Sequence, residues 1–346
     1  MGTLEYAIVI ATRNRPEALR LSVPRMLAQT RPPSQLIVVD SSDAFEPVSA
    51  AVALAVGSNS ITSVIEKSPK GLTLQRNRGL RHVECPITFF PDDDSIWFPD
   101  TAEQIVRVYE RDRAQMISGV CARESAQPPL NFGERLSLAY RMRRRDRLMQ
   151  RIGNLRTQFE ERIAPNPSRL LGRSYFKKFV PSEWHRANEV VPVEWMTGFR
   201  MSFRTDVIRK VGFDENFSNY CLLEDMDASL AAWEYGPVVA AHRSRVYHYR
   251  SPELRGSGRL TGATQILNRA YVIAKHTSAD SGVRRCLIVY LRYRIFLYLL
   301  SARGAFGRAR LAGALAALRH VNELLSSTPE FLGETYRNCI AAVLGD

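Results

Sequence analysis

Three consecutive aspartates near position ninety are the residues of this 346-residue chain best suited to chemistry. An apolar run, Ile87–Phe90, is followed by Pro91 and then by Asp92, Asp93 and Asp94. Carboxylates this close repel one another and raise each other's pKa unless a cation joins them. Oxygen ligands at the end of a strand suit a hard divalent ion such as Mg²⁺ or Mn²⁺, which can hold substrate phosphates. A solvated acidic turn is the alternative, and the triplet alone favours neither.

Alternating strand and helix patterns surround the triplet and predict the elements that must position it. The alternation predicts a parallel sheet with right-handed crossovers, in which ligands bind beyond the carboxyl ends of the strands. Thr12, Asp40 and Asp92 all fall at such ends, so a nucleotide-sized site is expected at one edge of the sheet. The expected strands are 6–11, 36–39, 61–65 and 87–90, and the expected helices are 16–28, 47–56 and 72–80.

The rest of the chain predicts a continuation of the sheet, an insertion and a helical tail. A mostly parallel, twisted α/β sheet flanked by helices is expected over residues 1–255, with a basic helical insertion at 122–190. Residues 256–346 are expected to form a helical C-terminal region. The further elements expected are a helix at 100–113, a strand at 114–120, a strand–turn–strand segment at 194–204, a turn at 212–215, a helix at 224–235 and strands at 238–241 and 245–249.

The composition is that of a soluble globular protein, with 45% hydrophobic and 24% charged residues. Five scattered cysteines, none in a Cys-x-x-Cys pair, argue against a disulfide framework and a zinc knuckle and indicate a reducing compartment. No secretory leader is predicted, because the apolar run at 6–10 is far too short. These features predict a cytoplasmic protein.

The net charge of +13 is concentrated in one segment. Between Arg135 and Lys178, thirteen basic residues stand against three acidic ones, so this stretch carries +10 and the remainder is close to neutral. Such a segment is attracted to phosphates, to an anionic membrane surface or to an acidic substrate, or it forms a solvated helix face. The charge pattern leaves these alternatives open.

Residues 287–300 are apolar enough to raise the question of a membrane helix. The run is shorter than the roughly 20 residues that a span requires. Arg292 and Arg294 interrupt it, and each would cost about 2.5–3.5 kcal/mol at the centre of a bilayer. A core helix or an interfacial helix is therefore expected. Three further arginines lie nearby for anionic headgroups, namely Arg303, Arg308 and Arg310.

Several motifs recur in an order that resembles family 2 glycosyltransferases of the GT-A fold, over roughly residues 5 to 250. Single motifs of this kind are weak signals, but their common order is specific. They are Thr-Arg-Asn-Arg-Pro at 12–16, Gln-Thr at 29–30, the segment 36–43 that ends in Val-Val-Asp-Ser-Ser-Asp, Gln-Arg-Asn-Arg-Gly-Leu at 75–80, Pro-Asp-Asp-Asp at 91–94, the segments 197–204 and 211–214, and Glu-Asp-Met-Asp at 224–227.

The resemblance implies an inverting transfer of a sugar from a nucleoside diphosphate sugar to a hydroxyl group of a glycan or lipid-linked acceptor, in polysaccharide or glycoconjugate biosynthesis. A UDP-, dTDP- or GDP-linked donor and a Mn²⁺ or Mg²⁺ cofactor are implied with it. In such a reaction the leaving diphosphate gains negative charge, which a divalent ion neutralises. The acceptor hydroxyl loses its proton to a general base.

The resemblance also implies roles for individual residues. Asp225 is implied as the general base with Glu224 in support, although acidic residues at a helix start also stabilise the helix dipole. Asp92, Asp94 and His248 are implied as metal ligands, although a single histidine is often structural. The implied donor-binding residues are Thr12, Arg13, Asn14, Asp40, Arg76, Asp92 and Asp93. The implied acceptor-binding residues are Trp195, Thr197 and Gly198, of which the tryptophan can stack on a sugar or pack in the core.

Two other functions stay open as alternatives. A nucleotidyltransferase also uses carboxylate-bound metal on an α/β sheet, but the sequence has no glycine-rich phosphate loop with an activating lysine. A non-catalytic protein that binds polyanions or a membrane surface would explain the basic segment. No helix-turn-helix, RNA-recognition or zinc signature is evident, so no nucleic acid partner is expected. Peripheral contact with an anionic membrane, at its inner face, is expected through the basic insertion or the C-terminal helices.

Overall fold

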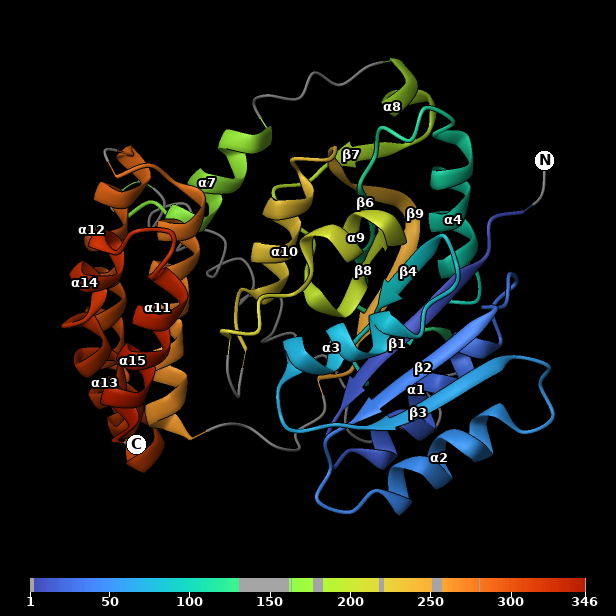
Figure 1. Ribbon diagram of the computed structural model, residues 1–346, viewed down its shortest axis with the longest axis horizontal. Helices are drawn as coiled ribbons and strands as arrows, with labels where there is room; N and C mark the ends of the chain where they lie inside the picture. The colour runs from blue at the N-terminus through green and yellow to red at the C-terminus, as the bar shows by residue number, and fades with distance from the viewer. Residues whose placement is uncertain are drawn as a thin grey trace. The chain divides into compact units, whose positions relative to one another are not determined.

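The computed structural model describes residues 3–130, 162, 164–176, 183–217, 221–250, 257–279 and 281–345. These residues fall into two compact units (Figure 1). The first unit comprises Met1–Pro128 and Tyr175–Arg255, and the second comprises Pro129–Ser174 and Gly256–Asp346. Most of the basic segment that is predicted to form a helical insertion lies outside the described residues.

Four parallel strands form one side of the sheet in the first unit, as the sequence predicts. The elements are β1 (Tyr6–Thr12), α1 (Pro16–Leu27), β2 (Gln35–Asp40), α2 (Glu46–Val56), β3 (Thr62–Lys67), α3 (Leu72–Arg81) and β4 (Ile87–Phe90). β1, β2 and β4 are almost entirely buried, which explains their continuous apolar sequence, because a parallel strand is covered on both faces. Pro16 begins α1, since the first turn of a helix needs no N–H donor at that position.

The other side of the sheet has mixed strand directions. Its elements are β5 (Ser95–Trp97), α4 (Thr101–Arg111), β6 (Gly119–Glu124), α8 (Glu183–Ala187), β7 (Val190–Pro192), a 3₁₀ turn (Gly198–Arg200), β8 (Met201–Arg204), α9 (Thr205–Val211), α10 (Glu224–Ala232) and β9 (Val238–His248). The strand order is β3-β2-β1-β4-β8-β6-β9-β5, and β7 pairs with β9. β8 runs antiparallel to β4 and β6, whereas β6 and β9 are parallel. In the described part of the chain this α/β sheet of nine strands confirms the predicted fold class.

The strand predicted at 114–120 starts only at Gly119. Asp112 follows α4, and its carboxylate accepts hydrogen bonds from the N–H groups of Met116 and Ile117, at 3.0 and 2.8 Å. These bonds fold the preceding residues into a turn. Strand propensity does not register such a local side-chain effect, so the predicted boundary was wrong.

Other predicted boundaries in this half are also corrected by the structure. The strands expected at 238–241 and 245–249 are one strand, β9. The segment 194–204 contains the 3₁₀ turn and β8, while the strand expected before them lies earlier, at β7. β5 and α9 have no counterpart among the predicted elements.

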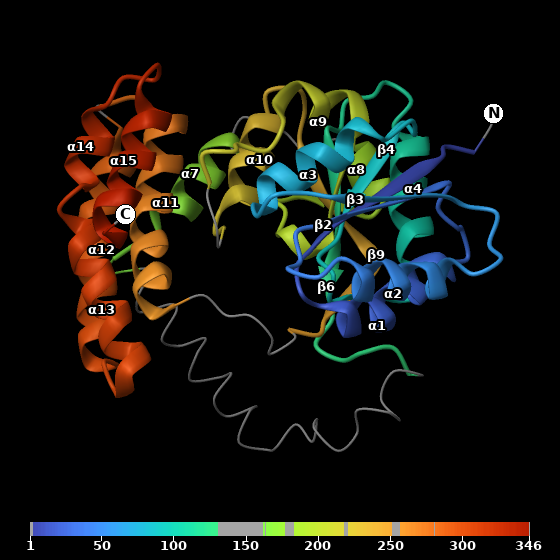
Figure 2. The ribbon, with the colours of Figure 1, turned by 60° about the horizontal axis from the view of Figure 1, so that its bottom comes forward.

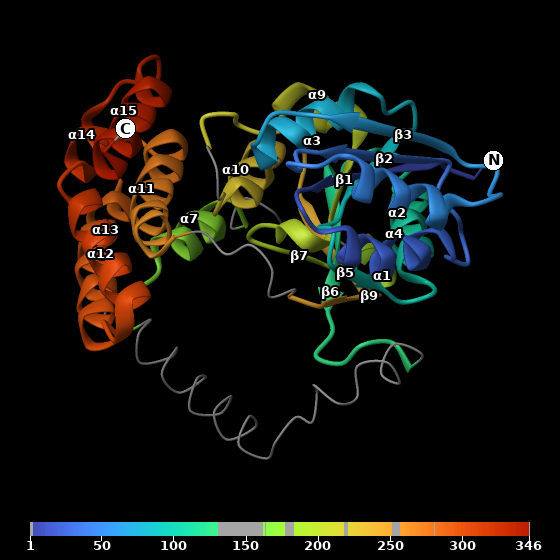
Figure 3. The ribbon, with the colours of Figure 1, turned by 90° about the horizontal axis from the view of Figure 1, so that it is seen from below.

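Helices lie on both faces of the sheet (Figure 3), and apolar side chains form a core on each face. Successive residues of β1 point to opposite faces, so Ile8 belongs to one core and Val9 to the other. Side chains of α1, α2 and α4 cover the first face, and those of α3, α9 and α10 cover the second. The strands are thereby fixed, and the loops at their carboxyl ends rest on a rigid support.

The second unit is helical (Figure 2), as predicted for the C-terminal region. Its described helices are most of α7 (Pro167–Phe176), α11 (Gly258–His276), α12 (Gly282–Leu300), α13 (Gly304–Leu318), α14 (Val321–Ser326) and α15 (Leu332–Leu344). Glycine lets α11 and α13 approach closely, because a Cβ atom on Gly262 would lie 2.0 Å from the Arg310 carbonyl oxygen. Among the described residues, no helix combines the length and the apolar character needed to cross a membrane.

Candidate active site

Direct contacts bring most of the predicted site residues together in the first unit. They connect the loop after β4 with α3, and α3 with the start of α10. They also connect the loop after β4 with the end of β9. The loop begins where β4 ends, so its carboxylates lie at the carboxyl edge of the sheet, where α/β proteins bind ligands.

Asp94 and His248 form the contact between the loop and β9. The Asp94 Oδ1 and His248 Nε2 atoms are 3.2 Å apart. The sheet register fixes this geometry, because Ser95 of β5 pairs with His248 of β9. The imidazole also stacks on the ring of Phe199, with 4.4 Å between ring centroids and an interplanar angle of 15°. Burial lowers the pKa of His248, but Asp94 and Asp92 outweigh burial, and the net effect is a raised pKa.

Asp92, Asp94 and His248 fit a single divalent ion. Their ligand atoms all lie within 4.8 Å of one another. Burial raises the pKa of Asp92; Arg76 opposes this effect and Asp94 reinforces it, so an added cation would stabilise the charged cluster. Two carboxylates and an imidazole suit Mn²⁺ or Mg²⁺, which prefer ligand sets rich in oxygen. The structure thus places the three predicted ligands together, and their role as ligands stays a prediction.

Arg15 contacts two of the three aspartates and was not among the predicted site residues. Its Nη1 atom lies 2.6 Å from Asp93 Oδ1, and its Nη2 atom lies 2.8 Å from Asp94 Oδ2. The Thr12 hydroxyl donates to the other oxygen of Asp93, at 2.8 Å. Burial raises the pKa of Asp93 to about 7, although Arg15 opposes the shift. Asp93 therefore connects the loop after β4 to Thr12 and Arg15, and its predicted contact with the donor stays untested.

Arg76 is 1% exposed and joins the aspartate loop to α10. Its Nη2 donates to Asp92 Oδ1 and its Nη1 donates to Glu224 Oε1, both at 3.0 Å. The guanidinium also lies 5.3 Å from the centroid of the Phe213 ring. The sequence predicted that Arg76 reaches the donor diphosphate. The structure instead shows it holding two carboxylates in place, and contact with a diphosphate stays a prediction.

Asp225 lies in the first turn of α10, where it accepts two backbone hydrogen bonds. Its Oδ2 accepts from the Gly198 N–H at 2.9 Å, and its Oδ1 accepts from the Met226 N–H at 2.7 Å. Burial and the neighbouring Glu224 carboxylate raise the pKa of Asp225 to about 7, and the two N–H groups oppose that shift. Leu223 precedes this pair in the left-handed region, with φ of 73°, a strained backbone for a leucine.

Gly198 begins the 3₁₀ turn and is the point where that turn approaches Arg76 and Asp225. A Cβ atom at this position would lie 3.2 Å from Arg76 Nη2 and 3.5 Å from Glu224 Oε1. Thr197 is adjacent and its hydroxyl accepts from the Arg200 guanidinium at 3.2 Å. Trp195 is partly buried on the same segment. Contact of this segment with an acceptor stays a prediction.

Asp40 is fully buried at the end of β2 and keeps one carboxylate oxygen unbonded. Its Oδ1 accepts from the backbone N–H of Ser42 at 2.9 Å and also from the Ser42 hydroxyl. Its Oδ2 has no hydrogen-bond partner among the described residues. Burial raises the pKa of Asp40, and the two bonds from Ser42 oppose that shift. A buried oxygen without a partner is costly in a folded protein, so a hydrogen-bond donor that reached it would stabilise the protein.

The remaining predicted donor-side residues join the loops after β1 and β2. The Asn14 N–H donates to Ser42 Oγ at 2.6 Å, and the Asn14 side chain exchanges bonds of 2.7 and 2.9 Å with Asp43. Arg13 lies 3.6 Å from the same Asp43 carboxylate. These contacts close the loops into one surface beside Asp40.

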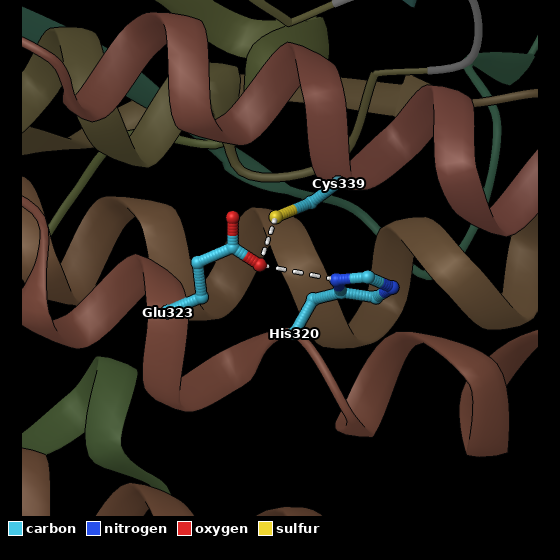
Figure 4. A group of neighbouring side chains, drawn as sticks. All are labelled: His320, Glu323 and Cys339. Atoms are coloured by element: carbon cyan, nitrogen blue, oxygen red, sulfur yellow. Dashed lines mark hydrogen bonds and ion pairs between the residues drawn. The ribbon is translucent and has the colours of Figure 1, made fainter.

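A second group of potential metal ligands lies in the second unit (Figure 4). It consists of His320, Glu323 and Cys339. The Glu323 Oε2 atom lies 3.2 Å from His320 Nδ1 and 3.7 Å from Cys339 Sγ, whose thiol donates to it. Burial raises the pKa of the Cys339 thiol to about 12, and Glu323 adds to the effect. These residues were not among the predicted site residues, because only the packing of α15 on α14 brings Cys339 to the local pair of His320 and Glu323.

Comparison with solved structures defines the class of protein. The crystal structure of residues 1–349 of TarS from S. aureus matches with a TM-score of 0.51 at 10% identity, over 99% of this chain and 92% of that chain. Its complex with UDP-GlcNAc matches with a TM-score of 0.53 at 11% identity, over 99% and 93%. PcManGT, a mannosyltransferase from Pyrobaculum calidifontis in complex with GDP-Man and Mn²⁺, has a TM-score of 0.47 at 14% identity, over 100% and 87%. The fold is that of the GT-A glycosyltransferases.

The family follows from the sequence. Residues 7–180, which are just over half of the chain, match the model of glycosyl transferase family 2, and the chain belongs to that family. A search among curated proteins gave no match. The family and the fold together make this protein a glycosyltransferase and confirm the predicted resemblance.

Proposed function

We propose that the protein is a metal-dependent, inverting glycosyltransferase. It moves a sugar from a UDP-, dTDP- or GDP-linked donor to a hydroxyl group of a glycan or lipid-linked acceptor, in polysaccharide or glycoconjugate biosynthesis. The observation that carries the proposal is the convergence of Asp92, Asp94 and His248, joined through Arg76 to the start of α10, where Asp225 lies. We also propose residues 1–255 as the transferase domain and the cytoplasm as its location.

Asp92, Asp94 and His248 would hold the divalent ion. Mn²⁺ or Mg²⁺ bound there would supply a positive charge for the donor diphosphate as the bond to the sugar breaks. The ion pair with Arg15 keeps Asp94 in position, and the stacked Phe199 ring limits the rotation of the His248 imidazole. The ligands are therefore arranged before the donor binds, which lowers the cost of ordering the site.

Asp225 is suited to accept the proton of the acceptor hydroxyl. Its raised pKa brings it close to neutral pH, where a general base is both deprotonated and basic enough to act. The N–H groups of Gly198 and Met226 fix the orientation of the carboxylate. Attack from the side opposite the diphosphate would invert the anomeric centre. Glu224 supports the arrangement through its bond with Arg76.

Asp40 is suited to bind the nucleoside part of the donor. Its free Oδ2 atom would accept a hydrogen bond from the nucleobase or the ribose. Arg13 and Asn14 contact the loop that follows Asp40, and Thr12 pairs with Asp40 in the sheet. TarS, which shares the fold, is seen in complex with UDP-GlcNAc. The family assignment favours sugar transfer over the alternative of nucleotidyl transfer.

The proposal is tested by thermal unfolding with UDP, dTDP and GDP, each with Mn²⁺, with Mg²⁺ and with a chelator. At least one nucleoside diphosphate should stabilise the protein only with metal, by about 2.7 kcal/mol at a concentration 100-fold above its Kd. The matching nucleotide sugar should then release its diphosphate when acceptor is added. Stabilisation that is equal in the chelator would contradict metal dependence, and the lack of any response would contradict the proposed function.

A further inference from the structure

Along α12, large apolar and basic side chains share one exposed stripe. The exposed positions recur every three or four residues, so they lie on one side of the helix. They include Arg285, Val289, Arg292, Phe296 and Leu299. The three apolar residues among them are 50%, 52% and 61% exposed. A helix on the surface of a globular domain normally turns its large apolar side chains toward the core. The exposure of three of them on α12 therefore needs an explanation other than core packing.

The stripe continues across the turn into α13. Three residues separate the two helices, which pack against each other (Figure 2). Leu300 at the end of α12 is 62% exposed, and Phe306 in the first turn of α13 is 51% exposed. Arg303 and Arg308 are exposed beside them. Leu299, Leu300 and Phe306 therefore lie within a few residues of the α12–α13 turn, and Phe296 lies one helical turn earlier on α12.

The charge of this region has one sign. Residues 281–322 contain eight arginines and neither aspartate nor glutamate. Arg294 and Arg310 lie over the Tyr298 ring, at 5.1 and 4.6 Å from its centroid. The exposed arginines of the stripe form no ion pair with any residue that the structure describes. The segment itself offers these arginines no carboxylate, so an anionic surface would lower the free energy of their charges.

We propose that the face formed by Arg292, Phe296, Leu299, Leu300, Arg303 and Phe306 binds the surface of an anionic membrane. We call it the α12–α13 face. The phenylalanine and leucine side chains would enter the boundary between headgroups and acyl chains, and the arginines would bind lipid phosphates. The helix lies in the interface without crossing the bilayer, in agreement with the lack of a spanning helix among the described residues.

Other occupants fit the α12–α13 face less well. A second copy of the chain would set the same arginines against each other, and like charges across an interface oppose association. A nucleic acid would match the arginines but would leave the exposed leucines without apolar contact. An anionic bilayer offers both components at once. The inference concerns the second unit, and it does not depend on which sugar the first unit transfers.

The experiment is sedimentation of the full chain with vesicles of phosphatidylcholine, alone or in equimolar mixture with phosphatidylglycerol. The wild type should bind the anionic vesicles, and binding should weaken as salt increases. The combined substitutions Phe296→Ser, Leu299→Ser and Leu300→Ser should weaken binding at least about tenfold. Arg292→Gln and Arg303→Gln should weaken it about fivefold per arginine.

Matched control substitutions in the first unit distinguish binding by this face from non-specific adsorption to vesicles. Leu54→Ser on α2 removes a leucine that is 76% exposed, and Arg113→Gln removes an exposed arginine after α4. Neither control should change vesicle binding. Because all the altered side chains are exposed, every variant should keep the melting temperature and the nucleotide binding of the wild type.

Three results would overturn the inference. The first is a wild type that does not sediment with anionic vesicles. The second is binding that survives both sets of substitutions, because the basic segment 135–178 would then be its source. The third is a wild type that forms a dimer and does not bind vesicles, with a dimer that the serine substitutions dissociate. The α12–α13 face would then be a self-association surface.

Discussion

Two groups of side chains in this protein could hold a metal ion, and their surroundings differ. Two further carboxylates lie beside Asp92, Asp94 and His248. Arg15 pairs with both Asp94 and Asp93, and Arg76 pairs with both Asp92 and Glu224. The second group has one carboxylate, that of Glu323. It accepts a hydrogen bond from the Cys339 thiol and lies next to the His320 imidazole. The first group and its neighbours place four carboxylates against two arginines, whereas the second group has a single carboxylate that already accepts a hydrogen bond.

We infer from the comparison that an imbalance of charge is a stronger sign of a metal site than the proximity of ligands. Burial raises the pKa of Asp92 and of Asp93, which records the cost of keeping these carboxylates ionised. In the second group burial raises the pKa of Cys339, so the thiol keeps its proton and donates a hydrogen bond to Glu323. A bound cation would stabilise the first arrangement and would have to displace a proton in the second.

The largest effect is expected from a substitution of the proposed general base, Asp225, which belongs to neither group of potential metal ligands. Asp225→Asn keeps the shape of the side chain but removes the base, so kcat should fall about 10²–10⁴-fold. The affinity for the nucleotide should stay within about twofold, because the proposed ligands are untouched. Steady-state kinetics and calorimetry measure the two quantities. A variant that retained most of its turnover would remove Asp225 from the mechanism.

Arg76 tests the charge imbalance in the first group directly. Arg76→Met leaves the Asp92 and Glu224 carboxylates without their shared cation and should destabilise the protein by about 3–5 kcal/mol in urea unfolding. Added Mn²⁺ should restore part of this stability. The control is Arg78→Met on the same helix, which breaks a more exposed pair with Glu66 and should cost less than about 1 kcal/mol. Equal losses in the two variants would contradict the interpretation.

Matched ligand substitutions compare the two groups. Asp94→Ala should weaken Mn²⁺-dependent nucleotide binding at least about tenfold, because one ligand and the partner of His248 are lost together. Glu323→Ala should leave that binding unchanged. Isothermal titration with and without Mn²⁺ measures both. The comparison between the groups fails if Glu323→Ala has the larger effect.

The pH dependence of the reaction gives the smallest of these effects. A base must be deprotonated to act, and burial raises the pKa of Asp225 to about 7. The value of kcat at saturating donor should therefore fall about tenfold per pH unit below that point and level off above it. The residual activity of Asp225→Asn should lack this slope. A flat profile in the wild type would show that another group accepts the proton.

The elements and residues that depend on local sequence were predicted well. The buried strands before Thr12, Asp40 and Asp92 follow from their apolar runs, and the structure places these residues at strand ends. The bridge from Arg15 to the aspartates was missed, because the two loops are almost eighty residues apart and only the sheet brings them together.

The predicted roles of Arg76 and Asp93 were less complete for a related reason. Sequence spacing identifies a charged side chain but not the partner it meets across the fold. Arg76 turns inward to two carboxylates, and Asp93 turns toward Thr12. The short strand β5 follows the three aspartates and pairs with β9, but three residues are too few for a periodic signal in the sequence.

The most direct test of the central claim is anomalous diffraction from crystals soaked with Mn²⁺ and the nucleoside diphosphate that stabilises the protein best. A manganese peak is expected within bonding distance of Asp94 and His248, next to the diphosphate oxygens. A peak beside Cys339 alone, or a nucleotide bound at the sheet edge with no metal near these side chains, would contradict the account.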